Sequence, residues 1–154
     1  MGRTEEIIGS WFARTGRRGE VVLASKVSGN STNPDFIRGG EGFDGTSIPK
    51  CIDASMKRIQ TVYLHLYQLH WPERSTNFFG KRGYQTDPGD SWEDNIKEVL
   101  ETLGLLVREG KIRQVGLSNE TPWGVMRFLQ EAGADPDRPR MIHIQNPYNL
   151  LTRL

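Results

Sequence analysis

Apolar residues follow two different spacings along this chain. Short, nearly continuous apolar runs are typical of buried strands. They occupy residues 20–26, 61–70, 113–119 and 141–145. Between them, apolar residues recur every three or four positions, which predicts amphipathic helices. These helical stretches cover residues 4–16, 47–59, 91–107 and 121–132.

Residues that favour helix ends stand at the borders of the helical stretches. An N-cap side chain accepts a hydrogen bond from a first-turn N–H group. Thr4, Ser47 and Thr121 can each do this, and Ser91 with Asp94 resembles a capping box. Gly16 is suited to ending the first helix.

The order of elements is one helix, three strand–helix repeats and a final strand. Strands separated by helices indicate βαβ units and parallel pairing. We therefore expect an α/β fold in which four strands lie parallel in chain order, with the helices on the outside. No linker divides the chain, so residues 1–154 are expected to form one domain.

Composition limits the function classes. Twenty basic residues against nineteen acidic ones give a net charge of +1, so we expect neither nucleic acid nor a membrane surface as a partner. The single cysteine excludes an internal disulfide. The apolar runs are too short to span a membrane, and the first residues lack a hydrophobic signal core. These features favour a cytoplasmic protein.

Polar side chains appear where each predicted strand ends. The four runs end at Lys26, His70, Ser118 with Asn119, and Gln145. Each has an ordinary explanation on its own: a solvated charge, a packed histidine or a turn residue. Parallel α/β folds, however, place their chemistry at the carboxyl ends of strands. Four such ends together indicate one site.

The segments that carry these residues resemble the aldo-keto reductase superfamily. They read "LASKV", "LYQLHWP", "GKIRQVGLSNETPWGVMRFL" and "IQNPYNLL". The phrases "HWPERSTNFFGK" and "LSNETPWGVMRFL" are most similar to the bacterial Tas-like branch and its plant relatives. The resemblance implies a partial (β/α)₈ TIM barrel that reduces small-molecule aldehydes or ketones with NADPH and needs no metal.

The resemblance also implies roles for the rim residues. Lys26 and His70 match two members of the family's catalytic set. Ser118, Asn119 and Gln145 match positions that hold the nicotinamide carboxamide of NADPH/NADP, which suits groups that both donate and accept hydrogen bonds. Trp71, which follows His70, would form a wall of the substrate pocket.

Two further catalytic residues of the family, an Asp and a Tyr in a "DTAxxY"-like segment, have no match here. No tyrosine occurs before Tyr63. The chain therefore resembles a central fragment, which we expect to be inactive alone and to self-associate through open sheet edges. An upstream transit peptide would instead direct it to a plastid.

The second strand departs from the family's "TDYLDLYQ" pattern, since Val62 and His65 replace its aspartates. We expect His65 to alter packing or pKa values near Lys26 and His70. Two function classes stay open: an oxidoreductase of which this chain is part, and a non-catalytic relative that binds a nucleotide or a partner.

Overall fold

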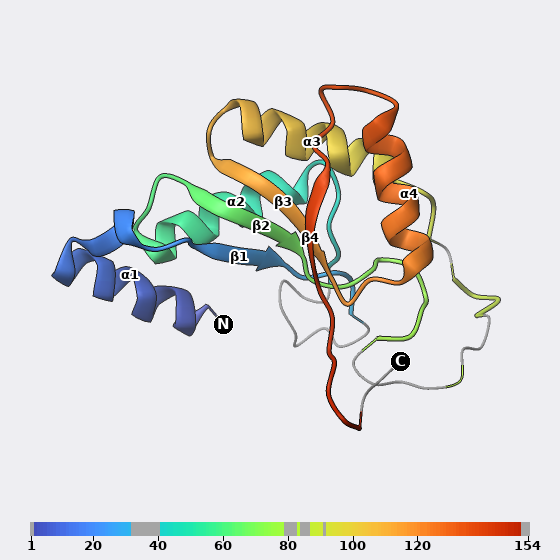
Figure 1. Ribbon diagram of the computed structural model, residues 1–154, viewed down its shortest axis with the longest axis horizontal. Coiled ribbons are helices and arrows are strands. Elements are labelled where there is room, and N and C mark those ends of the chain that lie inside the picture. Colours follow the sequence, from blue (N-terminus) through green and yellow to red (C-terminus); the bar gives the residue numbers. More distant parts are fainter. Residues whose placement is uncertain (1, 32–40, 79–82, 84–86, 91, 152–154) are drawn as a thin grey trace.

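Four parallel strands form the centre of the molecule (Figure 1). The computed structural model describes residues 2–31, 41–78, 83, 87–90 and 92–151. The strands are β1 (Ala24–Val27), β2 (Leu64–Leu69), β3 (Ile112–Ser118) and β4 (Met141–Gln145). Each pairs with its neighbour in the chain, in the order β1-β2-β3-β4, and every pairing is parallel. The expected topology is confirmed.

The helices alternate with the strands. They are α1 (Arg3–Thr15), α2 (Ser47–Ile59), α3 (Ile96–Arg108) and α4 (Pro122–Gly133), and a short 3-10 helix covers Arg17–Glu20. Figure 1 shows α2, α3 and α4 on one side of the sheet, while α1 lies beyond β1. None of the helices in the described part of the chain is long and apolar enough to cross a membrane.

The hydrophobic core lies between the sheet and its helices. Strand side chains such as Tyr67, Leu69 and Leu117 pack there against Ile52 of α2 and Leu103 of α3. Because side chains alternate along a strand, the intervening residues face the other way. That second side, which we call the open face, carries Lys26, Gln68, Gly116 and His143 in one row of paired positions.

Two predicted caps were wrong. α1 already begins at Arg3, with Gly2 rather than Thr4 at its N-cap. α2 begins at Ser47 itself, and the Asp44 carboxylate accepts hydrogen bonds from the N–H groups of Thr46 and Ser47. These bonds hold the pKa of Asp44 below its ordinary value.

α3 begins later than predicted. The Oδ1 atom of Asp94 accepts the hydrogen bond of Ile96 N at 3.1 Å, which starts the helix at Ile96. Ser91 lies outside the described residues. Two other predictions are confirmed: Gly16 ends α1 in the left-handed conformation, and the Thr121 hydroxyl accepts a bond from Gly124 N at the start of α4.

The bounds of three strands differ from those of the apolar runs. The 3-10 helix includes Glu20, the first residue of the predicted run, and β1 occupies only Ala24–Val27. β2 starts at Leu64 because Gln60 adopts a left-handed conformation and Thr61 N bonds back to Met56 O. β3 runs from Ile112 to Ser118, whereas β4 has the predicted bounds.

Candidate functional site

The carboxyl ends of the strands bring the predicted site residues to one rim. Lys26 lies one residue before the end of β1, and His70 directly follows β2. Ser118 and Gln145 are the last residues of β3 and β4 and are paired with each other. Four segments that are distant in sequence thus deliver polar groups to one edge of the sheet.

Lys26 and His70 line the same cavity. It has a volume of about 1000 Å³ and is bounded by α1, α2 and β1. Burial, and secondarily the nearby Lys26 ammonium, lower the pKa of His70 below its ordinary value. The His70 ring is therefore neutral at pH 7, and one ring nitrogen carries a proton that it can donate.

Hydrogen bonds tie the ends of β2, β3 and β4 together. Asn119 Nδ2 donates to His70 O at 2.8 Å and to Ser118 Oγ at 3.1 Å. Ser118 Oγ and Asn119 N both donate to Gln145 O, each at 3.0 Å. Asn119 holds this position in a left-handed conformation, with φ 52°. The three predicted carboxamide-binding residues are therefore neighbours.

Trp71 is buried beside this cavity. Its Nε1 donates to Asn30 O at 2.9 Å, and its ring lies 4.7 Å from that of His70. A Cβ atom at residue 29 would lie 2.6 Å from the indole, so only glycine lets the two loops approach this closely. Among the described residues, the lining of the Lys26–His70 cavity does not include Trp71.

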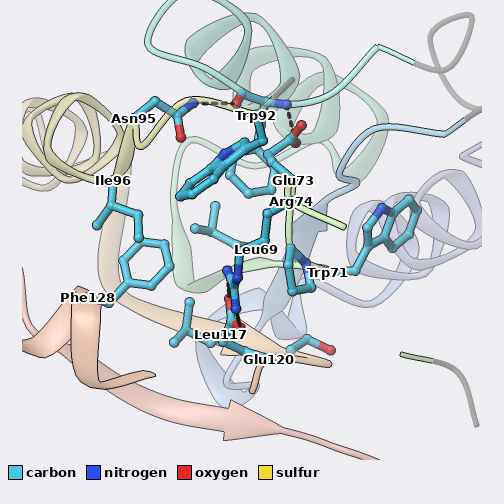
Figure 2. Close-up of a pocket in the computed structure, with 13 residues that line it drawn as sticks. Leu69, Trp71, Glu73, Arg74, Trp92, Asn95, Ile96, Leu117, Glu120 and Phe128 are labelled. Carbon is cyan, nitrogen blue, oxygen red and sulfur yellow. Dashed lines mark hydrogen bonds and ion pairs between the residues drawn. The ribbon is translucent and has the colours of Figure 1, made fainter. Parts of the chain in front are cut away.

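Trp71 instead lines a second, much smaller pocket beneath the rim (Figure 2). This pocket has a volume of about 10 Å³ and is closed by the apolar side chains of Leu69, Leu117 and Phe128. Figure 2 shows Arg74 and Glu120 meeting at the pocket, joined by dashed lines. They form an ion pair with side-chain exposures of 12% and 3%.

His65 acts far from the rim. It lies five residues before His70, about 16 Å away at the usual strand rise. Its Nδ1 accepts a hydrogen bond from Leu23 N at 3.1 Å. Burial first, and then the guanidinium groups of Arg18 and Arg113, lower the pKa of His65. The groups that shift the pKa of His70 are different, so the expected disturbance of that pKa by His65 was wrong.

Sequence reasoning missed three residues that brace the rim: Arg74, Glu120 and Asn146. Glu120 N donates to Asn146 Oδ1 at 3.1 Å, and Asn146 Nδ2 donates back to Glu120 O at 2.9 Å. Their place in the sequence could have pointed to them, because each lies within four residues after a predicted site residue. Nothing in the spacing says that they meet.

Comparisons of the sequence with known proteins identify its relatives. The sequence profile described as "Aldo/keto reductase family" matches residues 1–154. "Protein tas" of Escherichia coli strain K12 is 49% identical over 99% of this chain, which covers 44% of that protein. The "Aldo-keto reductase" of Babesia bovis is 35% identical over 87% of this chain, covering 49% of that protein.

A further relative carries a cofactor in its name. "Aldo-keto reductase yakc [NADP(+)]" of Schizosaccharomyces pombe is 34% identical over 77% of this chain and 29% of its own length. The chain thus spans less than half the length of each of these relatives.

Proposed function

This chain belongs to the aldo/keto reductase family, and we propose that it supplies the lysine–histidine pair and the carboxamide-binding residues of an NADPH-dependent carbonyl reductase. The observation that carries the proposal is the shared cavity of Lys26 and His70 at the carboxyl rim of a parallel sheet. The name of the fission yeast relative supports NADP(H) as the cofactor.

The rim residues fit a nicotinamide carboxamide. Asn119 Nδ2 is already bonded to His70 O and Ser118 Oγ, which leaves the amide oxygen to accept from the carboxamide NH₂ group. The exposed Gln145 side chain offers both a donor and an acceptor. Ser118, Asn119 and Gln145 would hold the ring so that one face meets the substrate.

Bound NADPH would supply a hydride to the carbonyl carbon. The neutral His70 ring can then donate a hydrogen bond to the carbonyl oxygen and stabilise its developing negative charge. The Lys26 ammonium favours the ionised form of an adjacent proton donor. That donor is the family's tyrosine, which these 154 residues do not match, so we expect the chain alone to lack turnover.

A second function is a non-catalytic module that binds a nucleotide or a partner protein. The chain covers 44% of Protein tas, so the activity of a whole relative does not by itself decide between the two functions. The first function predicts nucleotide binding at the rim and hydride transfer once the missing segments are supplied. The second predicts no hydride transfer, whether the module binds a nucleotide or a partner protein.

The experiment compares the 154-residue chain with a fusion that adds the flanking segments of Protein tas. NADPH consumption with an aldehyde is followed by absorbance. We expect turnover from the fusion and none from the chain. His70→Ala and Lys26→Ala should each lower turnover of the fusion about 10²–10⁴-fold. An inactive fusion that still binds NADPH would support the non-catalytic module, whereas turnover by the chain would refute the assignment of Lys26 and His70 as helpers.

A further inference from the structure

An ion pair joins the two loops that carry the candidate site residues. Arg74 Nη1 donates to Glu120 Oε2 at 3.2 Å, and Arg74 Nη2 donates to Glu120 Oε1, so the contact has two parallel bonds. Arg74 lies four residues after His70, and Glu120 directly follows Asn119. The loops after β2 and β3 are therefore linked by these side chains.

The surroundings hold the pair in one arrangement. Arg74 Nη2 also donates to Thr121 Oγ1 at 2.9 Å, and its guanidinium lies 4.7 Å from the ring centre of Trp123. Glu120 Oε1 accepts the hydrogen bond of Thr121 N at 2.6 Å. With both side chains nearly buried, neither charge can turn to water without leaving the other uncompensated.

α4 is shaped around this pair. A Cβ atom at Gly124 would lie 2.6 Å from Arg74 Nη2 and closer still to Glu120 Oε1. Glycine in a helix lowers stability relative to alanine. Its presence in the first turn of α4 is explained by the side chains of Arg74 and Glu120, which occupy the position of a Cβ atom. Charge, hydrogen bonding and helix packing all fix one relative position of the two loops.

We infer that Arg74 and Glu120 are positioning residues that set the distance between His70 and Asn119 for the nicotinamide ring. Neither side chain lines the described part of the cavity that holds Lys26 and His70, so neither touches the reacting atoms. They act through the backbone, where Asn119 Nδ2 reaches His70 O. The inference rests on the proposed function, because it assigns the pair to cofactor binding.

The test variant is Arg74→Lys, which keeps the positive charge but removes the paired bonds that need a guanidinium. Arg127→Lys is the matched control, because Arg127 also bonds two carboxylates, but these belong to Asp94, beside the start of α3, and Glu131, within α4, and not to residues next to His70 or Asn119. A double variant, Arg74→Met with Glu120→Leu, removes both charges without leaving either unpaired. This double variant replaces Arg74→Lys in the test if the lysine variant fails to fold.

Two readouts separate positioning from plain stability. Hydrogen exchange is measured at the amides of His70 and Asn119, which bond to Val27 O and Gln145 O. The amide of Leu64, bonded to Lys111 O at the far end of β2, reports global opening. NADPH affinity is measured by cofactor fluorescence under conditions where each variant is fully folded.

We expect Arg74→Lys to speed exchange at His70 and Asn119 beyond any change at Leu64, and to weaken NADPH binding about tenfold, the equivalent of one or two hydrogen bonds. The double variant should show the same two changes as Arg74→Lys. Arg127→Lys should change neither the exchange rates at the rim nor the NADPH affinity. Unchanged rim exchange, or unchanged affinity with faster exchange, overturns the inference. If even the fusion with the flanking segments of Protein tas binds no NADPH, the proposed function fails as well, and faster rim exchange then identifies a structural brace only.

Discussion

Asn119 donates its side-chain amide to the carbonyl oxygen of His70 at 2.8 Å, so a residue after β3 fixes the backbone at the end of β2. Asn119 makes this bond while its backbone is in the left-handed conformation, with φ 52°. Asparagine tolerates this region better than most residues because its short polar side chain bonds locally. One residue therefore combines an unusual backbone conformation with a contact between neighbouring strands.

Two variants of Asn119 separate the contribution of its side-chain hydrogen bonds to stability from that of its backbone conformation. Asn119→Gly removes the side-chain bonds but accepts the left-handed backbone, and we expect it to lower the free energy of unfolding by about 1 kcal/mol. Asn119→Ala also strains the backbone and should cost roughly 1 kcal/mol more. Urea unfolding measures both, and equal losses would show that backbone strain at Asn119 contributes nothing.

The space at Gly124 gives a prediction with an unusual sign. Glycine to alanine in a helix normally stabilises by about 1 kcal/mol. At Gly124 the new Cβ would meet Arg74 and Glu120, so Gly124→Ala should instead destabilise by roughly 1–3 kcal/mol. Gly133, the last residue of the same helix, is the control, because a Cβ atom added there would have no atom of the described residues within 4 Å.

Gly133→Ala should therefore leave thermal stability equal or slightly higher. Thermal unfolding of both variants is followed by circular dichroism. A stabilising Gly124→Ala would mean that the ion pair moves aside easily, and it would weaken the case for Arg74 and Glu120 as a rigid brace.

Stability should fall as the solution becomes acidic, partly through His65. Its pKa is lowered in the folded state, so below its ordinary value of about 6.5 the unfolded chain binds a proton that the folded chain resists. The contribution of His65 is complete above pH 6.5 and is lost as the pH falls through that value toward the folded-state pKa.

His65→Asn should flatten this part of the pH dependence. The asparagine Oδ1 can still accept the hydrogen bond from Leu23 N, but the side chain no longer titrates. Urea unfolding of both proteins between about pH 5 and 8 measures the difference, with ~0.5 pH steps resolving the slope. Parallel profiles would contradict a role for His65.

The edges of the sheet predict self-association of the chain. β1 and β4 form the two ends of the strand order, and an unpaired strand edge can pair with another chain. On β4, Ile142 and Ile144 have exposures of 60% and 45%. We expect light scattering at micromolar concentration to show dimers or larger species.

Ile142→Lys should reduce this association, because a charge on an edge strand opposes pairing. Leu105→Lys is the control, since Leu105 is similarly exposed, at 53%, but lies on α3 rather than on a strand edge. A monomeric parent chain that unfolds cooperatively would disprove association through the edges.

Sequence reasoning reached the sheet and its rim because both depend on local patterns. The run 141–145 became β4 with the predicted bounds, and Thr121 capped α4. Local patterns gave the wrong start for β2, where the turn made by the bond of Thr61 N to Met56 O is joined by a distant side chain. Arg18 bonds Thr61 Oγ1 and Tyr63 O across more than forty residues, in the stretch that was predicted to begin β2.

The residues of the candidate site likewise fall into those that local patterns predict and those that depend on distant contacts. Lys26, His70, Ser118 and Gln145 could be found because each marks the end of a strand. The link between Arg74 and Glu120 spans 46 residues and depends on the loop geometry, so no spacing within either segment announces it. Trp71 was visible as an aromatic residue at the rim, whereas its bond to Asn30 and its place in the lining of the small pocket depend on contacts between distant segments.

The chain-ordered sheet has a consequence for how the protein is made. Each strand pairs with the strand that precedes it in the sequence, so β1 and β2 can meet before α4 has been synthesised. Domains can fold during synthesis, with the N-terminal part first. Contacts between segments that are close in the sequence also form faster than contacts between distant segments. The growing sheet can therefore lengthen by one helix and one strand at a time, from β1 to β4.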